Sequence, residues 1–447
     1  MAPTRRQLLA GTGAVVGTVG VSGAAAARVT VDEIETDEPS PGTWPTDRYD
    51  PGNTATNPHA SPPSDPEIDW RVPVDADNAW KDGFVVGPDR VYHTGTRLTA
   101  LDRADGTRRW SRDEPSGALA VRDGTLYHCH GGNDSSDPRL SAFDAETGEP
   151  RWRTDVPEDS RGLTMTADRV FVSGRAFDAE DGRLEWTLDG NVNPGWTVSV
   201  AQDGFLYAQH SSHRVSKYAS RSLLDETLDR ETKPVWKRRH DSAYAHTVVR
   251  DDRLLRATGT TVGGAALARF DTETGRRTWA ALTAEEFESA TDTDPGDPED
   301  FAVATLEQAV TSEQCIVIAR TVGYRGSEEA GKETSALLAV SLSDGTIRWA
   351  RSFLGPDHPA HYTASSIIVA DRTVLVTVEE SMPAYGQREE PPYPGRILAV
   401  DADTSETLWG IKIDHEPAQL AVADDTIFAV TDGRSDSEDS TAVLALR

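Results

Sequence analysis

The chain has little cysteine, little lysine and no helical apolar period. Two cysteines, Cys129 and Cys315, can form at most one disulfide, which excludes a small fold held together by disulfides. Apolar residues do not recur every three to four positions over any long stretch, so a helical fold is not expected. Lysine occurs only at Lys81, Lys217, Lys233, Lys237, Lys332 and Lys412.

Acidic residues dominate the charge. The 447 residues include 74 Asp and Glu against 45 Lys and Arg, for a net charge of -29. Such a surface repels nucleic acid and anionic membranes, so neither is expected as a partner. An acidic, lysine-poor surface resembles proteins of salt-loving microbes, and an ordinary acidic secreted protein is the alternative. The length allows two or three domains or one large repeat array.

The first residues resemble a twin-arginine export signal. Arg5 and Arg6 stand in the stretch TRRQLL, followed by a weakly apolar Gly/Ala/Val run and by the Ala24–Ala27 cleavage site. We therefore expect residues 1–27 to be a signal peptide and the mature protein to be secreted or held at the cell surface. The alternative is an uncleaved signal whose Leu8–Ala27 segment anchors the protein in a membrane, although its many glycines fit a bilayer poorly. No cysteine ends this segment, so a lipid anchor is not indicated.

Residues 28–66 are rich in Pro, Ser, Thr, Asp and Asn, a composition typical of a linker. Within them the stretch WPTDRYDPGNT, Trp44 to Thr54, is too specific for a disordered linker.

An eleven-residue motif, A-x-D-x-x-[TD]-G-x-x-x-W, repeats along the rest of the chain. The repeats are spaced at roughly forty residues, with insertions before Trp349 and Trp409, which is typical of propeller blades. Alternating residues such as LTALD predict a strand, and the Asp and Gly predict a tight turn before the next strand. The motif tryptophans are Trp110, Trp152, Trp186, Trp236, Trp279, Trp349 and Trp409, and the turn glycines are Gly106, Gly148, Gly182, Gly275 and Gly345.

A second motif, a polar turn followed by an apolar strand, occurs eight times, from GPDRVYH at Gly87 to ADDTIFA at Ala423. The eighth tryptophan is Trp70, near the start of the repeat region, and the matching inner half-motif is Ala442–Leu446 at the end. We therefore predict that residues 67–447 form an all-β, eight-bladed propeller of four-stranded antiparallel blades, closed by pairing of its first and last strands. A tryptophan repeated in every blade is expected to be a wedge between blades rather than part of an aromatic binding cage.

The repeat resembles the PQQ-like propeller repeat that quinoprotein alcohol dehydrogenases share with BamB-like scaffolds, in the secreted haloarchaeal form. The resemblance covers residues 44–447, because WPTDRYDPGNT is similar to a segment that precedes many such propellers. It implies that Trp44, Arg48, Asp50, Asn53 and Thr54 pack against the ring. Two units, SLLDETLDRETKPVW and DADTSETLW, lack the turn glycine, so their hairpins are the least regular.

The resemblance also bears on cofactors. Quinoprotein enzymes of this family have a disulfide between adjacent cysteines beside the cofactor, a bound calcium ion and a catalytic aspartate. Cys129 and Cys315 are not adjacent, and no motif marks a calcium ligand or a catalytic aspartate. We therefore expect no catalytic residue, no metal site and no cofactor, with PQQ and calcium as the alternative. Whether the two cysteines pair is open.

Weaker patterns carry alternatives of their own. HCH (His128–His130), HSSH (His210, His213) and HPAH (His358, His361) offer nitrogen ligands but lack the spacing of a zinc site, so polar surface or channel lining is favoured. DTDPGDPED (Asp292–Asp300) and SDSEDS (Ser435–Ser440) are expected to be solvated loops rather than calcium sites. Asn133 is a candidate glycosylation site.

These observations favour a non-catalytic scaffold that binds an unidentified protein or extracellular ligand, with the loops inserted before Trp349 and Trp409 as the expected contact surface. The alternative is a PQQ-dependent dehydrogenase with a non-standard site. A monomer is expected.

Overall fold

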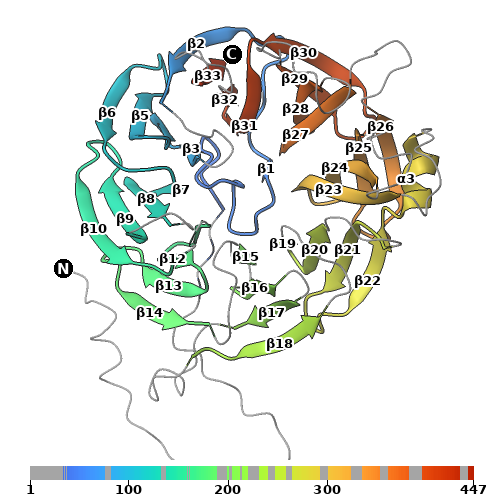
Figure 1. Ribbon diagram of the computed structural model, residues 1–447, viewed down its shortest axis with the longest axis horizontal. Coiled ribbons are helices and arrows are strands. Elements are labelled where there is room, and N and C mark those ends of the chain that lie inside the picture. The colour runs from blue at the N-terminus through green and yellow to red at the C-terminus, as the bar shows by residue number, and fades with distance from the viewer. Residues whose placement is uncertain are drawn as a thin grey trace, which may run out of the picture.

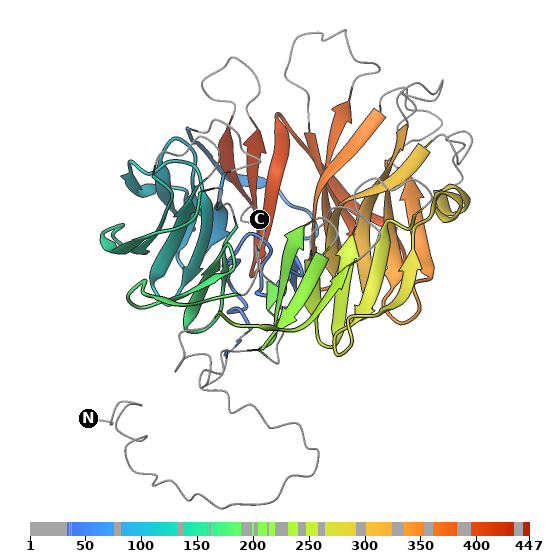
Figure 2. The same cartoon turned by 60° about the horizontal axis from the view of Figure 1, so that its bottom comes forward.

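The computed structural model describes residues 34, 36, 38–75, 82–131, 137–158, 160, 162–188, 199–200, 204–211, 214–219, 231–239, 247–257, 264–291, 301–323, 335–352, 361–381, 395–432 and 441–447. These residues form eight sheets arranged in a ring around a central axis, as Figure 1 shows from above and Figure 2 from the side. The architecture is an eight-bladed β-propeller, as predicted.

Each blade is a four-stranded sheet that runs from the axis to the rim, and we number the blades in chain order. Blade 1 is β3 (Phe84–Val86), β4 (Arg90–His93), β5 (Leu98–Asp102) and β6 (Arg108–Arg112). Blade 2 is β7 (Ala118–Arg122), β8 (Thr125–His130), β9 (Arg139–Asp144) and β10 (Pro150–Asp155). Blade 3 is β11 (Thr164–Met165), β12 (Arg169–Val172), β13 (Arg175–Asp178) and β14 (Leu184–Thr187). Blade 4 is β15 (Ser199–Val200), β16 (Leu206–Ser211), β17 (Arg214–Tyr218) and β18 (Pro234–Arg239).

The second half of the ring repeats this plan, with longer strands in blades 6 and 7. Blade 5 is β19 (Thr247–Arg250), β20 (Arg253–Ala257), β21 (Leu267–Asp271) and β22 (Arg277–Ala281). Blade 6 is β23 (Phe301–Val310), β24 (Gln314–Gly323), β25 (Ser335–Ser341) and β26 (Ile347–Ser352). Blade 7 is β27 (His361–Ala370), β28 (Thr373–Ser381), β29 (Gly395–Asp401) and β30 (Thr407–Ile413), and β1 (Thr56–Asn57) adds a parallel fifth strand beside β27.

Blade 8 joins the two ends of the propeller. It consists of β31 (Glu416–Ala423), β32 (Thr426–Asp432), β33 (Ala442–Leu446) and β2 (Ile68–Pro73). β2 is the outermost strand and is antiparallel to β33, with Trp70 opposite Ala445. The prediction that the first and last strands complete one blade is therefore confirmed.

Burial differs between the strands of a blade. Every residue of the third strand β25 is buried, whereas the outermost strand β10 alternates between exposed and half-buried residues. An inner strand has a neighbouring blade on both faces, while an outermost strand has one face in solvent. The tryptophan motif follows this pattern, because each tryptophan lies on an outermost strand.

The turn between the third and fourth strands has the chemistry that the motif predicts. In blade 2, Asp144 Oδ1 accepts hydrogen bonds from the backbone N–H groups of Glu146 (3.1 Å) and Thr147 (2.9 Å), and Gly148 has a φ of 71°. Blade 7 forms the same turn without a glycine, because Ser405 adopts a φ of 63° and donates its N–H to Asp401 O at 3.0 Å. The corresponding hairpin of blade 4 lies outside the described residues.

One helix was not expected from the sequence. Within the described residues, α3 (Ala284–Thr291) follows blade 5 and buries Phe287. Its start is a capping box, in which Thr283 N donates to Glu286 Oε2 (2.9 Å) and Glu286 N donates to Thr283 Oγ1 (3.2 Å). The signal was therefore the spacing of Thr283 and Glu286 rather than an apolar period. Among the described residues, no helix has the length and apolar character needed to cross a membrane.

Candidate functional site at the closed end of the ring

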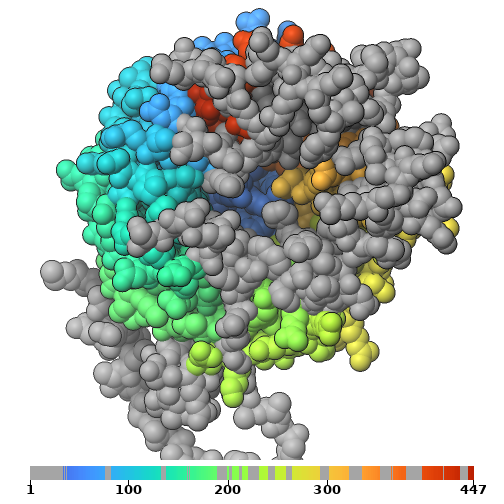
Figure 3. All heavy atoms as spheres, in the orientation of Figure 1, coloured from blue at the N-terminus to red at the C-terminus, as the bar shows by residue number. Residues whose placement is uncertain are grey.

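The segment Thr43–Ser61, here called the inner segment, runs around the axis inside the ring. Its backbone bonds to the ends of the innermost strands of blades 1, 2, 4, 5, 6, 7 and 8 in turn, at 2.8–3.0 Å. The segment's atoms, coloured blue, occupy the centre of the ring in Figure 3. The inner segment therefore closes this end of the axis. The bonds join Trp44 to Val86, Pro45 to Val121, Pro51 to Val200, Gly52 to Val249, Thr54 to Val310, Ala55 to Val369 and Ser61 to Asp424.

The side chains singled out by the family resemblance hold this segment in place. Trp44 is 1% exposed and its ring lies 5.2 Å from that of Tyr49. Arg48 pairs with Glu307 of blade 6 and donates to Gln308 O, and Asn53 Nδ2 donates to Ser199 Oγ at 2.8 Å. Asp50 accepts hydrogen bonds from the N–H and hydroxyl of Thr54, and burial raises the pKa of its carboxyl group. These residues pack against the ring, as the resemblance implies.

Asn57 fixes the segment through its side chain. Its side chain is fully buried, and Nδ2 donates to Val422 O at 3.0 Å, to Pro41 O at 3.2 Å and to Thr43 O at 3.4 Å. One amide thus ties the two ends of the inner segment to blade 8. The composition of residues 28–66 predicts a linker, because a solvated chain and a segment that bonds to inner strands are both rich in short polar residues.

A cavity of about 810 Å³ lies against the inner segment. Its walls are the first hairpin turns of blades 1, 2 and 8 and the third hairpin turns of blades 1 and 2, so it opens at the end of the ring where these turns lie. Thr46 and Tyr49 of the inner segment also line it. A second cavity of about 310 Å³ lies beyond Glu38 and Pro39, which line both. Neither cavity was anticipated from the sequence.

The arginines at the cavity have partners within the protein. Arg103 Nη2 pairs with Asp424 (2.8 Å) and donates to Ala423 O (2.7 Å), which joins blade 1 to blade 8. Arg90 pairs with Asp102 at 3.1 Å. Arg447 pairs with Asp69 and donates from Nη2 to Arg103 O at 3.0 Å. The positive charges of the cavity wall are therefore already neutralised.

Three carboxylates at the same cavity, unlike its arginines, have no partner of opposite charge among the described residues. Asp89, Glu146 and Asp425 are exposed and line the cavity, and none forms a salt bridge with a basic residue in the part of the chain that the structure describes. The cavity therefore presents negative charge to its opening.

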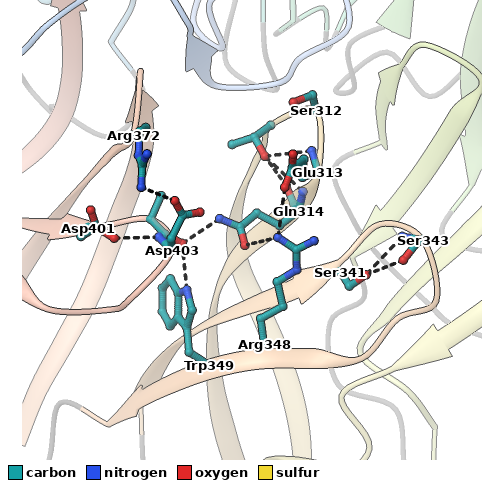
Figure 4. A network of polar contacts seen from close by, with 12 residues as sticks. Ser312, Glu313, Gln314, Ser341, Ser343, Arg348, Trp349, Arg372, Asp401 and Asp403 are labelled. Carbon is teal, nitrogen blue, oxygen red and sulfur yellow. Dashed lines mark hydrogen bonds and ion pairs between the residues drawn. The ribbon is translucent and has the colours of Figure 1, made fainter.

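The repeat tryptophans lie between blades, which fits the wedge interpretation. Trp110 Nε1 donates to Ala145 O of blade 2 at 3.2 Å, and Trp349 Nε1 donates to Ala402 O of blade 7 at 2.8 Å. Gln314 Nε2 donates to the same Ala402 oxygen at 2.7 Å, as Figure 4 shows at the junction of blades 6 and 7. Trp186 differs, because its buried Nε1 has no hydrogen-bond partner among the described residues. It faces blade 4, whose motif lacks the turn glycine.

The HCH pattern lies at the junction of blades 1 and 2, at the other end of the strands. The rings of His128 and His130 stack with centroids 6.3 Å apart, and each bonds to a backbone oxygen of the preceding loop, Pro115 O at 3.0 Å and Ser116 O at 2.9 Å. Burial lowers the pKa of His128 to about 3. In the described residues, no group of three or more His, Cys, Asp or Glu is arranged to hold a metal ion.

Both cysteines are buried and free, Cys129 in β8 of blade 2 and Cys315 in β24 of blade 6. They do not pair with each other. Burial raises the pKa of each thiol to about 12.

Several predicted features lie outside the described residues: the export signal with Arg5 and Arg6, Asn133, His213, His358, Asp292–Asp300 and Ser435–Ser440, and much of the loops before Trp349 and Trp409.

Comparison with known proteins identifies the family. The family model described as outer membrane protein assembly factor BamB matches residues 67–222 and 226–446. The chain belongs to this family. BamB from Moraxella catarrhalis is similar in structure at 14% identity, with a TM-score of 0.49 over 85% of this chain and 97% of BamB.

Two other similar proteins are enzymes by name. A europium-containing methanol dehydrogenase has a TM-score of 0.53 at 13% identity, over 88% of this chain and 90% of the enzyme, which shows a shared fold alone. The serine/threonine-protein kinase AfsK of Streptomyces coelicolor is 31% identical over 159 residues, which are 34% of this chain and 18% of the kinase.

Proposed function

We propose that this protein is a non-catalytic BamB-like scaffold that is exported by the twin-arginine pathway and binds a protein or extracellular ligand at the cell surface. The observation that carries the proposal is that the inner segment fills the end of the axis with its own side chains. Trp44, Arg48, Asp50 and Asn53 fill the closed end of the axis, and their polar groups bond to one another and to the innermost strands. The outer-membrane role in the family's description is not carried over to this chain.

The cysteines support the same proposal. The resemblance to quinoprotein enzymes implies adjacent cysteines beside the quinone, but Cys129 and Cys315 lie on different blades and are fully buried. These residues do not fit that requirement. A quinone-dependent reaction would need a site of another kind, and no motif in the sequence marks one.

Calorimetric titration of the mature protein with PQQ tests this function, in high salt, with and without calcium. We expect no binding heat and no rise in melting temperature in either condition. Calcium-dependent, stoichiometric binding would overturn the scaffold proposal and favour a dehydrogenase. Cross-linking at the cell surface followed by mass spectrometry then identifies the partner.

Export is tested separately from binding. Substituting both Arg5→Lys and Arg6→Lys should leave the precursor uncleaved inside the cell, because the twin-arginine pair is the feature that the pathway reads. The control variant keeps both arginines and carries Gln7→Asn. We expect this variant to be secreted normally. Unchanged secretion of the double-lysine variant would contradict this route.

The acidic surface leads us to propose adaptation to brine. With a net charge of -29, self-repulsion is strong in dilute buffer and is screened by salt, since the Debye length falls to about 3 Å at 1 M. The melting temperature should therefore rise steeply with potassium chloride. A melting temperature independent of salt would favour an ordinary acidic secreted protein.

A further inference from the structure

The large cavity carries an inference about the partner, which rests on the scaffold function proposed above. Acidic residues surround this end of the ring in a regular way. Within the described residues, blades 1, 2, 3, 5, 6, 7 and 8 each place at least one carboxylate at the turn between their first and second strands. One carboxylate from each turn is Asp89, Asp123, Asp168, Asp251, Glu313, Asp371 and Asp424. All of these except Asp89 and Asp371 form a salt bridge with an arginine of the protein itself within the described residues.

An acidic rim alone does not make a site, because it can simply be solvated. The pairing of charged residues in the cavity wall is a further observation. Arg90, Arg103 and Arg447 are held by carboxylates of the protein itself, whereas Asp89, Glu146 and Asp425 have no basic partner among the described residues. A ligand entering the cavity therefore meets available carboxylates and no available guanidinium from those three arginines.

A second observation concerns two residues of the cavity lining, Thr46 and Tyr49. Tyr49 is 2% exposed and Thr46 is 5% exposed, and the hydroxyl groups of both are buried without a hydrogen-bond partner among the described residues. A buried hydroxyl without a partner costs about 1–3 kcal/mol, so such groups usually serve a ligand or water. Both can accept a hydrogen bond from an ammonium or guanidinium group.

We propose that the cavity binds lysine or arginine side chains of an extended basic segment on a partner protein. Charged N–H groups of the segment bond to Asp89 and Asp425 at the cavity mouth, and one inserted side chain reaches the hydroxyls of Tyr49 and Thr46. An extended segment is preferred to a small cation because the unpaired carboxylates Asp425, Asp89 and Glu146 come from the consecutive blades 8, 1 and 2, where successive basic residues of one segment can meet them.

The test is fluorescence anisotropy with a labelled oligo-arginine peptide, in the lowest salt at which the protein keeps its folded circular dichroism spectrum. An oligo-citrulline peptide of equal length is the neutral probe. We expect the arginine peptide to bind at least about tenfold more tightly, and binding to weaken as salt is raised. Equal binding of the two peptides would overturn the proposal. Spermidine binding more tightly than oligo-arginine would overturn the assignment to a protein segment.

Variants locate the binding. The double variant Asp89→Asn, Asp425→Asn should bind the arginine peptide about tenfold more weakly. The double variant Asp155→Asn, Glu285→Gln changes the net charge equally at exposed residues that do not line the cavity, and it should bind like the wild type. An equal effect of the two double variants would mean that net charge alone attracts the peptide, which overturns the site.

Tyr49→Phe tests the cavity lining, since it removes the hydroxyl and keeps the ring against Trp44. Binding should weaken by about threefold to tenfold while the melting temperature is kept or rises, because the lost hydroxyl bonds to no other group in the described part of the chain. Unchanged binding would exclude contact with this hydroxyl. The PQQ titration tests the scaffold function separately, so failure of the peptide to bind removes this inference and leaves that proposal standing.

Discussion

Gly148 lies directly against the indole ring of Trp110, so that a Cβ added to the glycine would be 2.7 Å from Trp110 Cδ2. The two residues belong to consecutive blades. The tryptophan of one blade is thus covered by the turn glycine of the next, and this contact is repeated around the ring. The other pairs are Trp70 with Gly106, Trp152 with Gly182, Trp236 with Gly275 and Trp279 with Gly345.

We predict that Gly148→Ala destabilises the protein through two effects. The positive φ of 71° costs an L-residue about 1–2 kcal/mol, and the clash with Trp110 adds about 1–3 kcal/mol. Gly124→Ala is the matched control, because Gly124 has a φ of 72° and nothing within 4 Å of the added Cβ. Chemical denaturation should show the larger loss for Gly148→Ala, and equal losses would contradict the stacking contact.

Asn57→Ala should destabilise the closed end of the ring. The change removes an amide that donates to the carbonyl oxygens of Pro41, Thr43 and Val422, and it leaves those of the buried residues Thr43 and Val422 without this donor. A loss on the order of 3 kcal/mol in the free energy of unfolding is expected. His59→Ala is an exposed control in the same region. If both variants melt alike, Asn57 does not fix the inner segment.

Buried histidine predicts a pH dependence. Burial lowers the pKa of His93 to about 4 from an ordinary value of 6.5. Between these pH values the unfolded chain binds more protons than the folded one, so the free energy of unfolding falls as the pH is lowered from 6.5 to 4. Each pKa unit corresponds to about 1.4 kcal/mol.

His93→Gln should flatten this dependence, since glutamine does not titrate. The measurement is urea denaturation at a series of pH values. His128, with a pKa lowered to about 3, contributes in the same direction, so part of the slope remains in the His93 variant. An unchanged slope for His93→Gln would show that His93 is not held in its neutral form.

Both thiols should be unreactive in the folded protein. Cys129 and Cys315 are fully buried, and a pKa of about 12 leaves almost no thiolate at neutral pH. Alkylation followed by mass spectrometry should label neither cysteine under native conditions and both after denaturation without a reductant. A thiol that stays blocked after denaturation would mean that a disulfide forms in the mature protein.

The ring could be predicted from the sequence because its information is local and repeated. Each blade has its own tryptophan, most have the Asp turn, and Trp70 with Ala442–Leu446 marks the closure. The path of the inner segment could not be predicted, because it depends on single backbone bonds to strands far along the chain, such as Thr54 to Val310. The cavity was missed for the same reason, since its walls come from blades 1, 2 and 8 and the inner segment.

Ser405 takes the place of the turn glycine in blade 7, so the absence of a glycine from the motif does not predict that the turn is lost. A missing glycine suggested an irregular hairpin, yet the backbone bond to Asp401 and the side-chain bonds of Asp401 to Asp403 and Thr404 keep the turn. Several weak local contacts here outweigh the conformational cost of one residue.

The inner segment also sets the order in which the protein can be completed during synthesis. Its residues leave the ribosome before any blade exists, but Ser61 bonds to Asp424 and Asn57 to Val422, which are among the last residues made. Partly synthesised chains therefore lack the part of the docking surface that blade 8 supplies. The earlier blades can bind the inner segment as they are made, but its last contacts, and with them the closed end of the ring, have to wait for nearly the whole chain.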